Sequence, residues 1–351
     1  MRSLAAFLLA LALPAIGAAY DPVTPGAALA FPADHGAHPG HRIEWWYVTG
    51  QLEDGAAKPI GFQVTFFRLR NAEADGSESR FAPKQLLMAH AAIADPSRGS
   101  LLHDQRAARE GFGLATAKIG DTDVSIGRWR LAREGEDYVA EIPADGFSLT
   151  LRMTPTQPVL LQGERGFSRK GPDARHASYY YSQPQLAVRG RLVIDGKARE
   201  MKGRAWLDHE WSSELLVQGA VGWDWIGVNL DDGGALMAFR LRDASGEPLW
   251  ASALVREADG RVRTYSHSEV AFRPLRRWRS PRTNAEYPVA MAVTLGASEW
   301  RVEPWMPDQE LDSRASTGTV YWEGAVSVTG PQGRKGAGYL ELTGYAGPLR
   351  F

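Results

Sequence analysis

The sequence of 351 residues contains no cysteine. Disulfide bridges, thiol catalysis and lipid attachment to an N-terminal cysteine are therefore excluded. Neither sign of charge is in excess, because 40 lysines and arginines stand against 41 aspartates and glutamates. Since no basic field attracts phosphates, we expect no nucleic-acid partner.

Long apolar runs are also missing. No stretch after residue 19 approaches 18 consecutive apolar residues, so we expect no transmembrane segment. The run from Leu4 to Leu13 is too short to span a bilayer; it follows Arg2 and precedes small residues at positions 17–19. This pattern predicts a cleaved signal peptide over residues 1–19 and a periplasmic or secreted protein that begins near Tyr20. The alternative is a buried N-terminal helix.

The sequence offers no clear amphipathic helix. The nearest candidate, residues 85–94, fits a strand equally well. Short strand-like segments dominate instead, such as Phe147–Met153, where apolar and polar residues alternate with a period of two. Asp-Gly turns recur between the segments, for example at residues 54–55, 145–146 and 232–233. The sequence therefore predicts an all-β fold of antiparallel barrels or sandwiches.

Two tryptophan-rich stretches resemble each other. Residues 45–55 match residues 223–233 at an offset of 178, with Trp45 aligned to Trp223. The tetrapeptide Phe-Arg-Leu-Arg follows each copy, at residues 67–70 and 239–242. This period far exceeds the 20–50 residues of solenoid repeats and indicates a duplicated domain. We expect residues 44–52 and 223–230 to form equivalent strands.

The repeat and the composition suggest a division of the chain. Residues 20–42 are rich in proline, glycine and alanine without periodicity, which is typical of an extended arm. Two β domains of ordinary size would follow, over residues 43–185 and 186–351.

The densest group of reactive side chains lies in residues 203–211. As a strand, this segment has two faces: Ala205, Leu207, His209 and Trp211 form the first, and Arg204, Trp206, Asp208 and Glu210 the second. We expect the first face to line a cavity, where His209 exchanges a proton and the Trp211 ring stabilises a cation. That chemistry suits water addition to an alkene or a cyclisation through a carbocation. The alternative is a structural histidine bonded to backbone.

Three motifs make the chain recognisable: residues 38–50 (His-Pro-Gly-His-Arg-Ile-Glu-Trp-Trp-Tyr-Val-Thr-Gly), residues 205–211 (Ala-Trp-Leu-Asp-His-Glu-Trp) and residues 338–345 (Gly-Tyr-Leu-Glu-Leu-Thr-Gly-Tyr). In this order they resemble the AttH-like family, which also contains the carotenoid 1,2-hydratases and a group labelled secreted hydrolases. The resemblance implies two lipocalin-like β-barrels in tandem and an apolar ligand. It also implies a site built from a His-x-Trp pair and a Tyr-x-Asp pair.

His209-x-Trp211 matches the first pair. The second pair has no counterpart in the strand after Asp232-Gly233, so the resemblance does not extend to carotenoid hydration itself. The other catalytic candidates are Asp208, Glu210 and Glu44, whose carboxyl beside two tryptophans could have a raised pKa. The alternative for Glu44 is an ion pair with an arginine inside a barrel.

Further candidates would bind the ligand: Trp45, Trp46, Tyr47, His90, Tyr180, Tyr181, Trp223, Asp224 and Trp225. Asp224 is the possible substitute for the missing acid, and His90 has a structural alternative in an apolar core. His35, His38 and His41 have clip-like spacing but lack cysteine support, so we expect no metal and no cofactor.

Two functions remain open. The first is an exported enzyme that hydrates, isomerises or hydrolyses an isoprenoid or lipid-like molecule; no Gly-x-Ser-x-Gly elbow supports serine catalysis. The second is a periplasmic carrier of an apolar ligand. Family resemblance alone adds a possible association with an ABC-type export system. The Asp-His-Glu-Trp segment slightly favours the enzyme.

Overall fold

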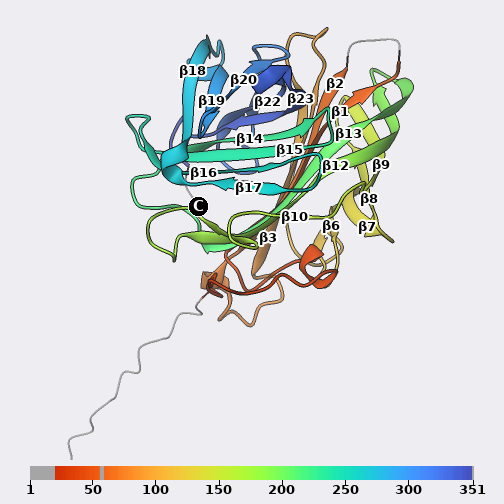
Figure 1. The fold of residues 1–351 in the computed structure, drawn as a ribbon. Helices are drawn as coiled ribbons and strands as arrows, with labels where there is room; N and C mark the ends of the chain where they lie inside the picture. Colours follow the sequence, from red (N-terminus) through yellow and green to blue (C-terminus); the bar gives the residue numbers. More distant parts are fainter. Residues whose placement is uncertain (1–19, 56–58, 350–351) are drawn as a thin grey trace, which may run out of the picture.

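The computed structural model describes residues 20–55 and 59–349, so the predicted signal peptide lies outside the described residues. Within them, strands dominate and the helices are single 3₁₀ turns, as the alternating patterns predicted (Figure 1). These turns are η1 (Ala33–His35), η2 (Ala72–Ala74), η3 (His267–Glu269) and η4 (Pro331–Gly333). None of these described helices has the length and apolar character needed to cross a bilayer.

The first sheet has the strand order β4-β3-β2-β1-β13-β12-β9-β8-β7-β6-β5, and every pairing in it is antiparallel. Two short strands, β10 and β11, pair with β12 outside this order. The strands are β1 (Ile43–Glu53), β2 (Ile60–Arg70), β3 (Gln85–Ala94), β4 (Leu102–Arg109), β5 (Ala115–Ala117), β6 (Asp123–Ile126), β7 (Trp129–Glu134), β8 (Asp137–Pro143), β9 (Phe147–Thr154), β10 (Leu160–Leu161), β11 (Phe167–Arg169), β12 (Ala177–Ile194) and β13 (Lys197–Glu214).

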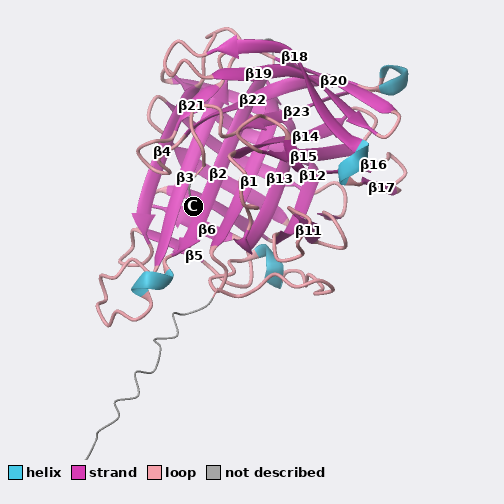
Figure 2. Ribbon diagram, turned by 90° about the vertical axis from the view of Figure 1, so that its left-hand side faces the viewer, coloured by secondary structure: helices cyan, strands magenta, loops and turns pink. Residues whose placement is uncertain are grey.

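The second sheet repeats this arrangement with the order β17-β16-β15-β14-β23-β22-β20-β19-β18, and β21 pairs with β22 outside it. In Figure 2 the strands of the two sheets overlap, with β18, β19 and β20 at the top of the view. The strands are β14 (Gly222–Leu230), β15 (Ala235–Arg242), β16 (Pro248–Arg256), β17 (Val262–Tyr265), β18 (Val270–Arg279), β19 (Glu286–Leu295), β20 (Ser298–Pro304), β21 (Glu310–Asp312), β22 (Val320–Thr329) and β23 (Lys335–Leu342).

Both sheets curl into barrels. In the first, β6 contacts β3 and β4 near the opposite edge, and in the second, β16 contacts β18. Each barrel encloses its own apolar core. The fold is therefore the predicted pair of antiparallel β-barrels, and the ambiguous segment 85–94 is strand β3.

The predicted division at residues 185 and 186 does not coincide with the division between the sheets. It falls inside β12, and β12 and β13 both belong to the first sheet, which ends at Glu214. The long β12–β13 hairpin carries a turn at Asp195-Gly196, and the sequence gives no reason to assign the hairpin to the following half. The second sheet begins at Gly222.

The predicted repeat is visible in the topology, because β1 and β14 occupy the same place in their sheets. The two matched blocks differ in register by two residues. Trp45 pairs with Phe67 on β2, whereas the residue paired with Phe239 on β15 is Trp225. With the Phe-Arg-Leu-Arg tetrapeptides aligned, Trp45 corresponds to Trp225 rather than Trp223. A shift of two preserves the strand face, so the sequence pattern could not reveal it.

Strand alternation separates the barrel interior from the surface between the barrels. On β1, Trp46 and Val48 point into the first core, while Trp45 and Tyr47 belong to an apolar cluster shared by both barrels. On β14, Ile226 and its neighbours of equal parity fill the second core. The outer faces of the two sheets are therefore packed against each other by large aromatic side chains.

The N-terminal arm crosses one end of the first barrel. The carbonyl of His35 accepts hydrogen bonds from Trp46 Nε1 (3.2 Å) and Thr122 Oγ1 (2.8 Å). The Ala37 amide donates to the carbonyl of Lys118. The arm is thus bound to the barrel by interior groups, and it contains the turn η1 rather than being extended throughout.

Candidate functional site

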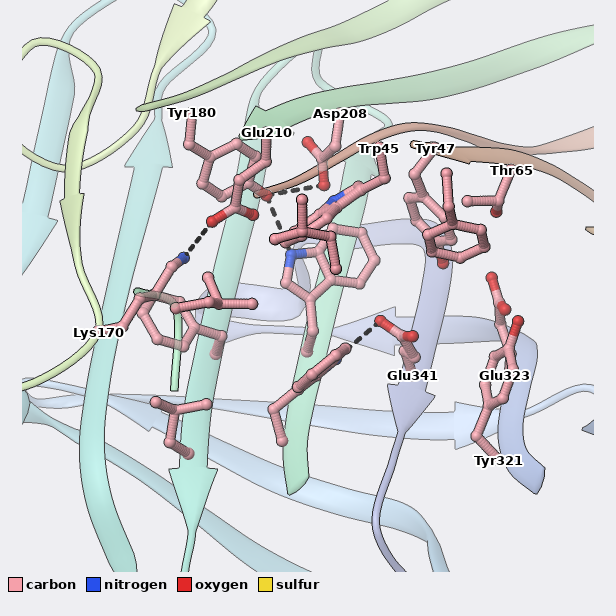
Figure 3. A pocket seen from close by; sticks show the side chains of 17 residues that line it. Trp45, Tyr47, Thr65, Lys170, Tyr180, Asp208, Glu210, Tyr321, Glu323 and Glu341 are labelled. Atoms are coloured by element: carbon pink, nitrogen blue, oxygen red, sulfur yellow. Dashed lines mark hydrogen bonds and ion pairs between the residues drawn. The ribbon is translucent and has the colours of Figure 1, made fainter. Parts of the chain in front are cut away.

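A pocket with a free volume of about 80 Å³ lies between the two barrels (Figure 3). Strands β1, β2, β12 and β13 of the first barrel and β14, β15, β22 and β23 of the second provide nearly all of its walls. The lining residues are Ile43, Trp45, Tyr47, Thr65, Phe67, Lys170, Tyr180, Asp208, Glu210, Leu215, Trp223, Trp225, Phe239, Leu241, Tyr321, Glu323 and Glu341. Most of these side chains are aromatic or aliphatic, which suits an apolar ligand.

One end of the pocket is built around Asp208 on β13. Its Oδ1 accepts hydrogen bonds from Ser182 Oγ (2.5 Å) and Trp206 Nε1 (2.7 Å). Its Oδ2 accepts one from the Tyr180 hydroxyl (2.7 Å), which in turn accepts from Trp225 Nε1 (3.1 Å). All of these donors are uncharged. They fix the carboxyl in place without neutralising a negative charge.

The electrostatics of Asp208 follow from this arrangement. Burial penalises the charged carboxylate, and it raises the pKa of Asp208 from 3.8 to about 7. The hydrogen bonds from Ser182, Tyr180 and Trp206 lower the pKa, and the carboxylate of Glu210 raises it further. Asp208 is consequently poised to give and take a proton near neutral pH.

Glu210, two residues further along β13, forms an ion pair with a lysine, whereas Asp208 has no charged partner in the described part of the chain. Its Oε1 lies 2.7 Å from Lys170 Nζ and also accepts a hydrogen bond from Ser178. Both partners of the ion pair are buried. Lys170 also lies over the ring of Phe239, at 4.2 Å from its centroid. Lys170 and Glu210 thus close this end of the pocket as a neutral pair.

The other end of the pocket contains Glu323 on β22 and Glu341 on β23, which are partners across the two strands. Glu341 Oε2 accepts a hydrogen bond from Trp223 Nε1 (3.0 Å). Burial raises the pKa of Glu341 to about 7 and that of Glu323 well above its ordinary value, and the neighbouring carboxyl adds to the shift of Glu323. This end is therefore acidic without being strongly charged at neutral pH.

The opposite face of β13 carries His209 and Trp211 into the first barrel, as the alternation predicted, but the pocket lies on the other face. His209 is fully buried, and its Nε2 lies 2.9 Å from Glu44 Oε1. Its Nδ1 lies 3.1 Å from the carbonyl of Asp34, in the arm. Trp46 stacks on the imidazole at 4.7 Å. Nδ1 therefore joins the arm to the barrel, whereas Nε2 joins strands β13 and β1.

Glu44 is the centre of this interior network. Its Oε2 accepts from Arg68 Nε (2.7 Å), and its Oε1 lies 2.7 Å from His38 Nδ1. Burial opposes ionisation of Glu44, yet the bonds from His209 and His38 and the charge of Arg68 hold its pKa well below the ordinary value. The alternative reading of Glu44, an arginine-paired carboxylate inside a barrel, is the one observed.

Three of these side chains also have a metal-like arrangement. His38, Glu44 and His209 offer ligand atoms within 4.8 Å of one another. The arginine that already contacts the carboxylate disfavours a dication at the same place. The three histidines of the predicted clip, His35, His38 and His41, do not share one site. His35 Nδ1 bonds the hydroxyl of Tyr181 (2.7 Å), and neither ring nitrogen of His41 has a hydrogen-bond partner among the described residues.

The AttH-like family model matches residues 22–345. The chain belongs to the AttH-like family. A solved structure assigned to AttH, from Nitrosomonas europaea, is 54% identical, with a TM-score of 0.87 over 93% of this chain and 99% of that one. No curated protein sequence matches the chain.

Two further solved structures share the AttH-like fold at low identity. Kievitone hydratase from Nectria haematococca is 14% identical, with a TM-score of 0.70 over 93% of this chain and 96% of that chain. CghA, solved with Sch210972, is 15% identical, with a TM-score of 0.50 over 86% of this chain and 88% of that chain. At these identities the likeness concerns the fold.

The predicted site residues of this AttH-like chain fall into separate groups. Those in the pocket are Trp45, Tyr47, Tyr180, Asp208, Glu210, Trp223 and Trp225. Those inside the first barrel are Glu44, Trp46, Tyr181, His209 and Trp211. Of the remaining two, His90 bonds the pocket residue Tyr321 (2.8 Å) and Ser316 (2.9 Å), which joins the barrels. Asp224 is paired with Arg240 and Arg242 and lies outside the pocket.

Sequence reasoning assigned no role to Lys170, Tyr321, Glu323 or Glu341. Lys170 lies in a loop just after β11, where no periodicity marks it. The two glutamates did have a signal, because β22 and β23 each carry a Tyr-x-Glu pair, at residues 321–323 and 339–341. The period of two places the tyrosine and the carboxyl of each pair on one face.

Proposed function

We propose that this protein is a hydratase-type enzyme that adds water to a carbon–carbon double bond of an apolar small molecule, or removes it, in the pocket between the barrels. The observation that carries this proposal is Asp208, a buried carboxyl with uncharged partners in an aromatic pocket. The AttH-like family and the hydratase named among the structural neighbours support the same class of reaction.

The reaction can be written with Asp208 as the acid and the base. The protonated carboxyl gives its proton to one alkene carbon, and the electron pair of the double bond forms the new C–H bond. The oxygen of a water molecule then bonds to the other carbon, and the surplus proton of that water returns to the Asp208 carboxylate. The net change is alkene plus water to alcohol, and the reverse sequence dehydrates.

The developing cation would be stabilised by the pocket. Trp45, Trp223 and Trp225 line it, and indole faces attract positive charge by about 0.5–2 kcal/mol each. Tyr180 holds Asp208 through its hydroxyl and is a positioning residue for the proton transfer. Because hydration requires the protonated form of Asp208, its rate should fall about tenfold per pH unit above pH 7.

In the sequence-based hypothesis, His209 transfers the proton and the ring of Trp211 stabilises the cation. That hypothesis stays a prediction. The contacts of His209 with Glu44 and Asp34 favour the pocket-facing Asp208 instead. We also infer that the enzyme acts after export, which rests on the pattern of residues 1–19. Association with an ABC-type export system rests on the family resemblance alone.

The test follows water into the product. Purified protein is incubated in oxygen-18 water with the apolar extract of the cells that produce it, and mass spectrometry finds species that gain one labelled water. Wild type should form such a species, and Asp208→Asn should form it about 10²–10⁴-fold more slowly, the usual range for general acid–base catalysis. Asp259→Asn, an exposed aspartate of the second barrel, is the matched control.

Two outcomes would contradict the proposal. Full activity of Asp208→Asn would remove Asp208 from the chemistry. If a lipid co-purifies with the protein, is recovered unchanged and gains no label, the protein is the carrier that the sequence left open.

A further inference from the structure

Glu323 is a buried acid that interacts with the hydroxyls of Tyr47 and Tyr321 without forming a hydrogen bond of good geometry to either. Its side chain is 2% exposed and lines the pocket at the end away from Asp208 (Figure 3). Within the described residues, neither Oε1 nor Oε2 has a partner of hydrogen-bonding geometry. The hydroxyl of Tyr47 on β1, also a pocket residue, interacts with Glu323 but likewise has no hydrogen bond of good geometry. Folded proteins leave few buried polar groups unsatisfied, so two in one pocket indicate a place for a polar group of the ligand.

The surroundings restrict what that group can be. Lys170 is the single cation among the described lining residues, and it is held by Glu210. An anionic group would therefore meet three acids, Asp208, Glu323 and Glu341, without a positive charge to receive it. A permanent cation would require one of the three acids to ionise, which burial opposes in each of them. A neutral group is favoured.

The neutral group must also match the polar atoms. Burial and the neighbouring Glu341 raise the pKa of Glu323, which favours its protonated form. A protonated carboxyl has one donor and further acceptor capacity, and the Tyr47 hydroxyl likewise both donates and accepts. A hydroxyl group, with one donor and two acceptor lone pairs, complements this pair.

We propose that Glu323 and Tyr47 bind a hydroxyl group of the substrate, so that the substrate is an apolar alcohol with its hydroxyl at this end and its reacting carbons at Asp208. The identity of the reaction rests on the proposed function, but the binding does not. Glu323 thus selects the substrate, and Asp208 acts on it.

The test compares two probes that differ in one hydrogen-bond donor. Geraniol and geranyl methyl ether share the same unsaturated chain, and isothermal titration calorimetry gives their affinities for the full protein. Wild type should bind the alcohol about tenfold more tightly than the ether, the size expected for a hydrogen bond with a buried group. Glu323→Met removes both oxygens at similar length, so it should bind both probes with the affinity that wild type has for the ether.

Three further variants sharpen the result. Tyr47→Phe should reduce the preference for the alcohol with little change in shape, and it serves if Glu323→Met fails to fold. Asp208→Asn should keep the full preference, which separates this proposal from the proposed reaction: lost turnover with retained preference supports both. Glu299→Met, an exposed glutamate of β20, should change neither affinity.

Several results would overturn the hydroxyl site. For wild type, these are equal affinity for both probes, binding of neither probe, or tighter binding of geranylamine than of geraniol. For Glu323→Met, the contradicting result is an equal loss of affinity for both probes. Each of these leaves the isotope test of Asp208 unaffected.

Discussion

Glu44 and Asp208 are both buried carboxyls on adjacent strands, yet their surroundings are opposite. Glu44 faces the interior of the first barrel and contacts the guanidinium of Arg68 and two imidazoles. Asp208 faces the pocket and contacts only hydroxyls and an indole. The pKa of Glu44 is held well below the ordinary value, whereas burial raises that of Asp208 to about 7. The charge of the partner decides whether a buried carboxyl is a fixed anion or a titrating acid.

The second barrel also contains a buried carboxylate that is paired with arginine. Asp224 on β14 pairs across the hairpin with Arg240, just as Glu44 pairs with Arg68. Arg242 and the hydroxyl of Tyr345 also contact it. The duplicated barrels thus share an arginine-paired interior carboxylate. The acids of the pocket lie outside this shared feature and arise where the barrels meet.

The largest expected effect is a difference in stability between variants of the arginine-paired carboxylates and a variant of Asp208. Glu44→Gln and Asp224→Asn each leave a buried arginine without its anion and should lower the free energy of unfolding by about 3–5 kcal/mol. Asp208→Asn should cost only about 1–2 kcal/mol, because neutral donors lose an acceptor and no charge is left unpaired. Urea unfolding at pH 7 measures all three. Equal losses of unfolding free energy in the three variants would contradict the difference between Glu44 and Asp208.

A smaller effect is expected at His209. Its bond to the carbonyl of Asp34 holds the arm and its bond to Glu44 joins two strands, so His209→Ala should cost about 1–3 kcal/mol and loosen residues 33–42. Hydrogen exchange of the amides of Ala37 and His41 measures the loosening, with His90→Ala as a control, because His90 bonds Tyr321 and Ser316 rather than the arm. If His209→Ala instead abolishes turnover without changing exchange, the sequence-based role of His209 is correct and that of Asp208 is wrong.

The sequence predicted most of the fold because its signals are local. Strand alternation predicted the two faces of residues 203–211 correctly. The Asp-Gly turns and the repeat predicted a duplicated antiparallel β domain, and the family resemblance implied that each copy is a barrel. Alternation cannot tell which face meets the barrel core and which meets a second barrel. That choice depends on how the sheets pack, so the cavity was assigned to the face of His209 rather than to that of Asp208.

The acid pair of the second barrel was missed for a related reason. The second acid was expected on the strand after Asp232-Gly233, whereas Glu323 and Glu341 lie on β22 and β23, about a hundred residues later in the chain. These strands come beside β14 only because β23 pairs with it and β22 follows. Long-range pairing of this kind leaves no trace in local periodicity.

The central claim, that Asp208 is the titrating acid of the pocket, is tested most directly by infrared difference titration of its carboxyl band. Wild type minus Asp208→Asn isolates this group from Glu341, whose pKa is also raised to about 7. The account predicts a protonated-carboxyl band below pH 7 that disappears with a midpoint near 7, and that Glu44→Gln retains it. A midpoint near the ordinary value of 3.8, or a difference spectrum that lacks this band, would contradict it.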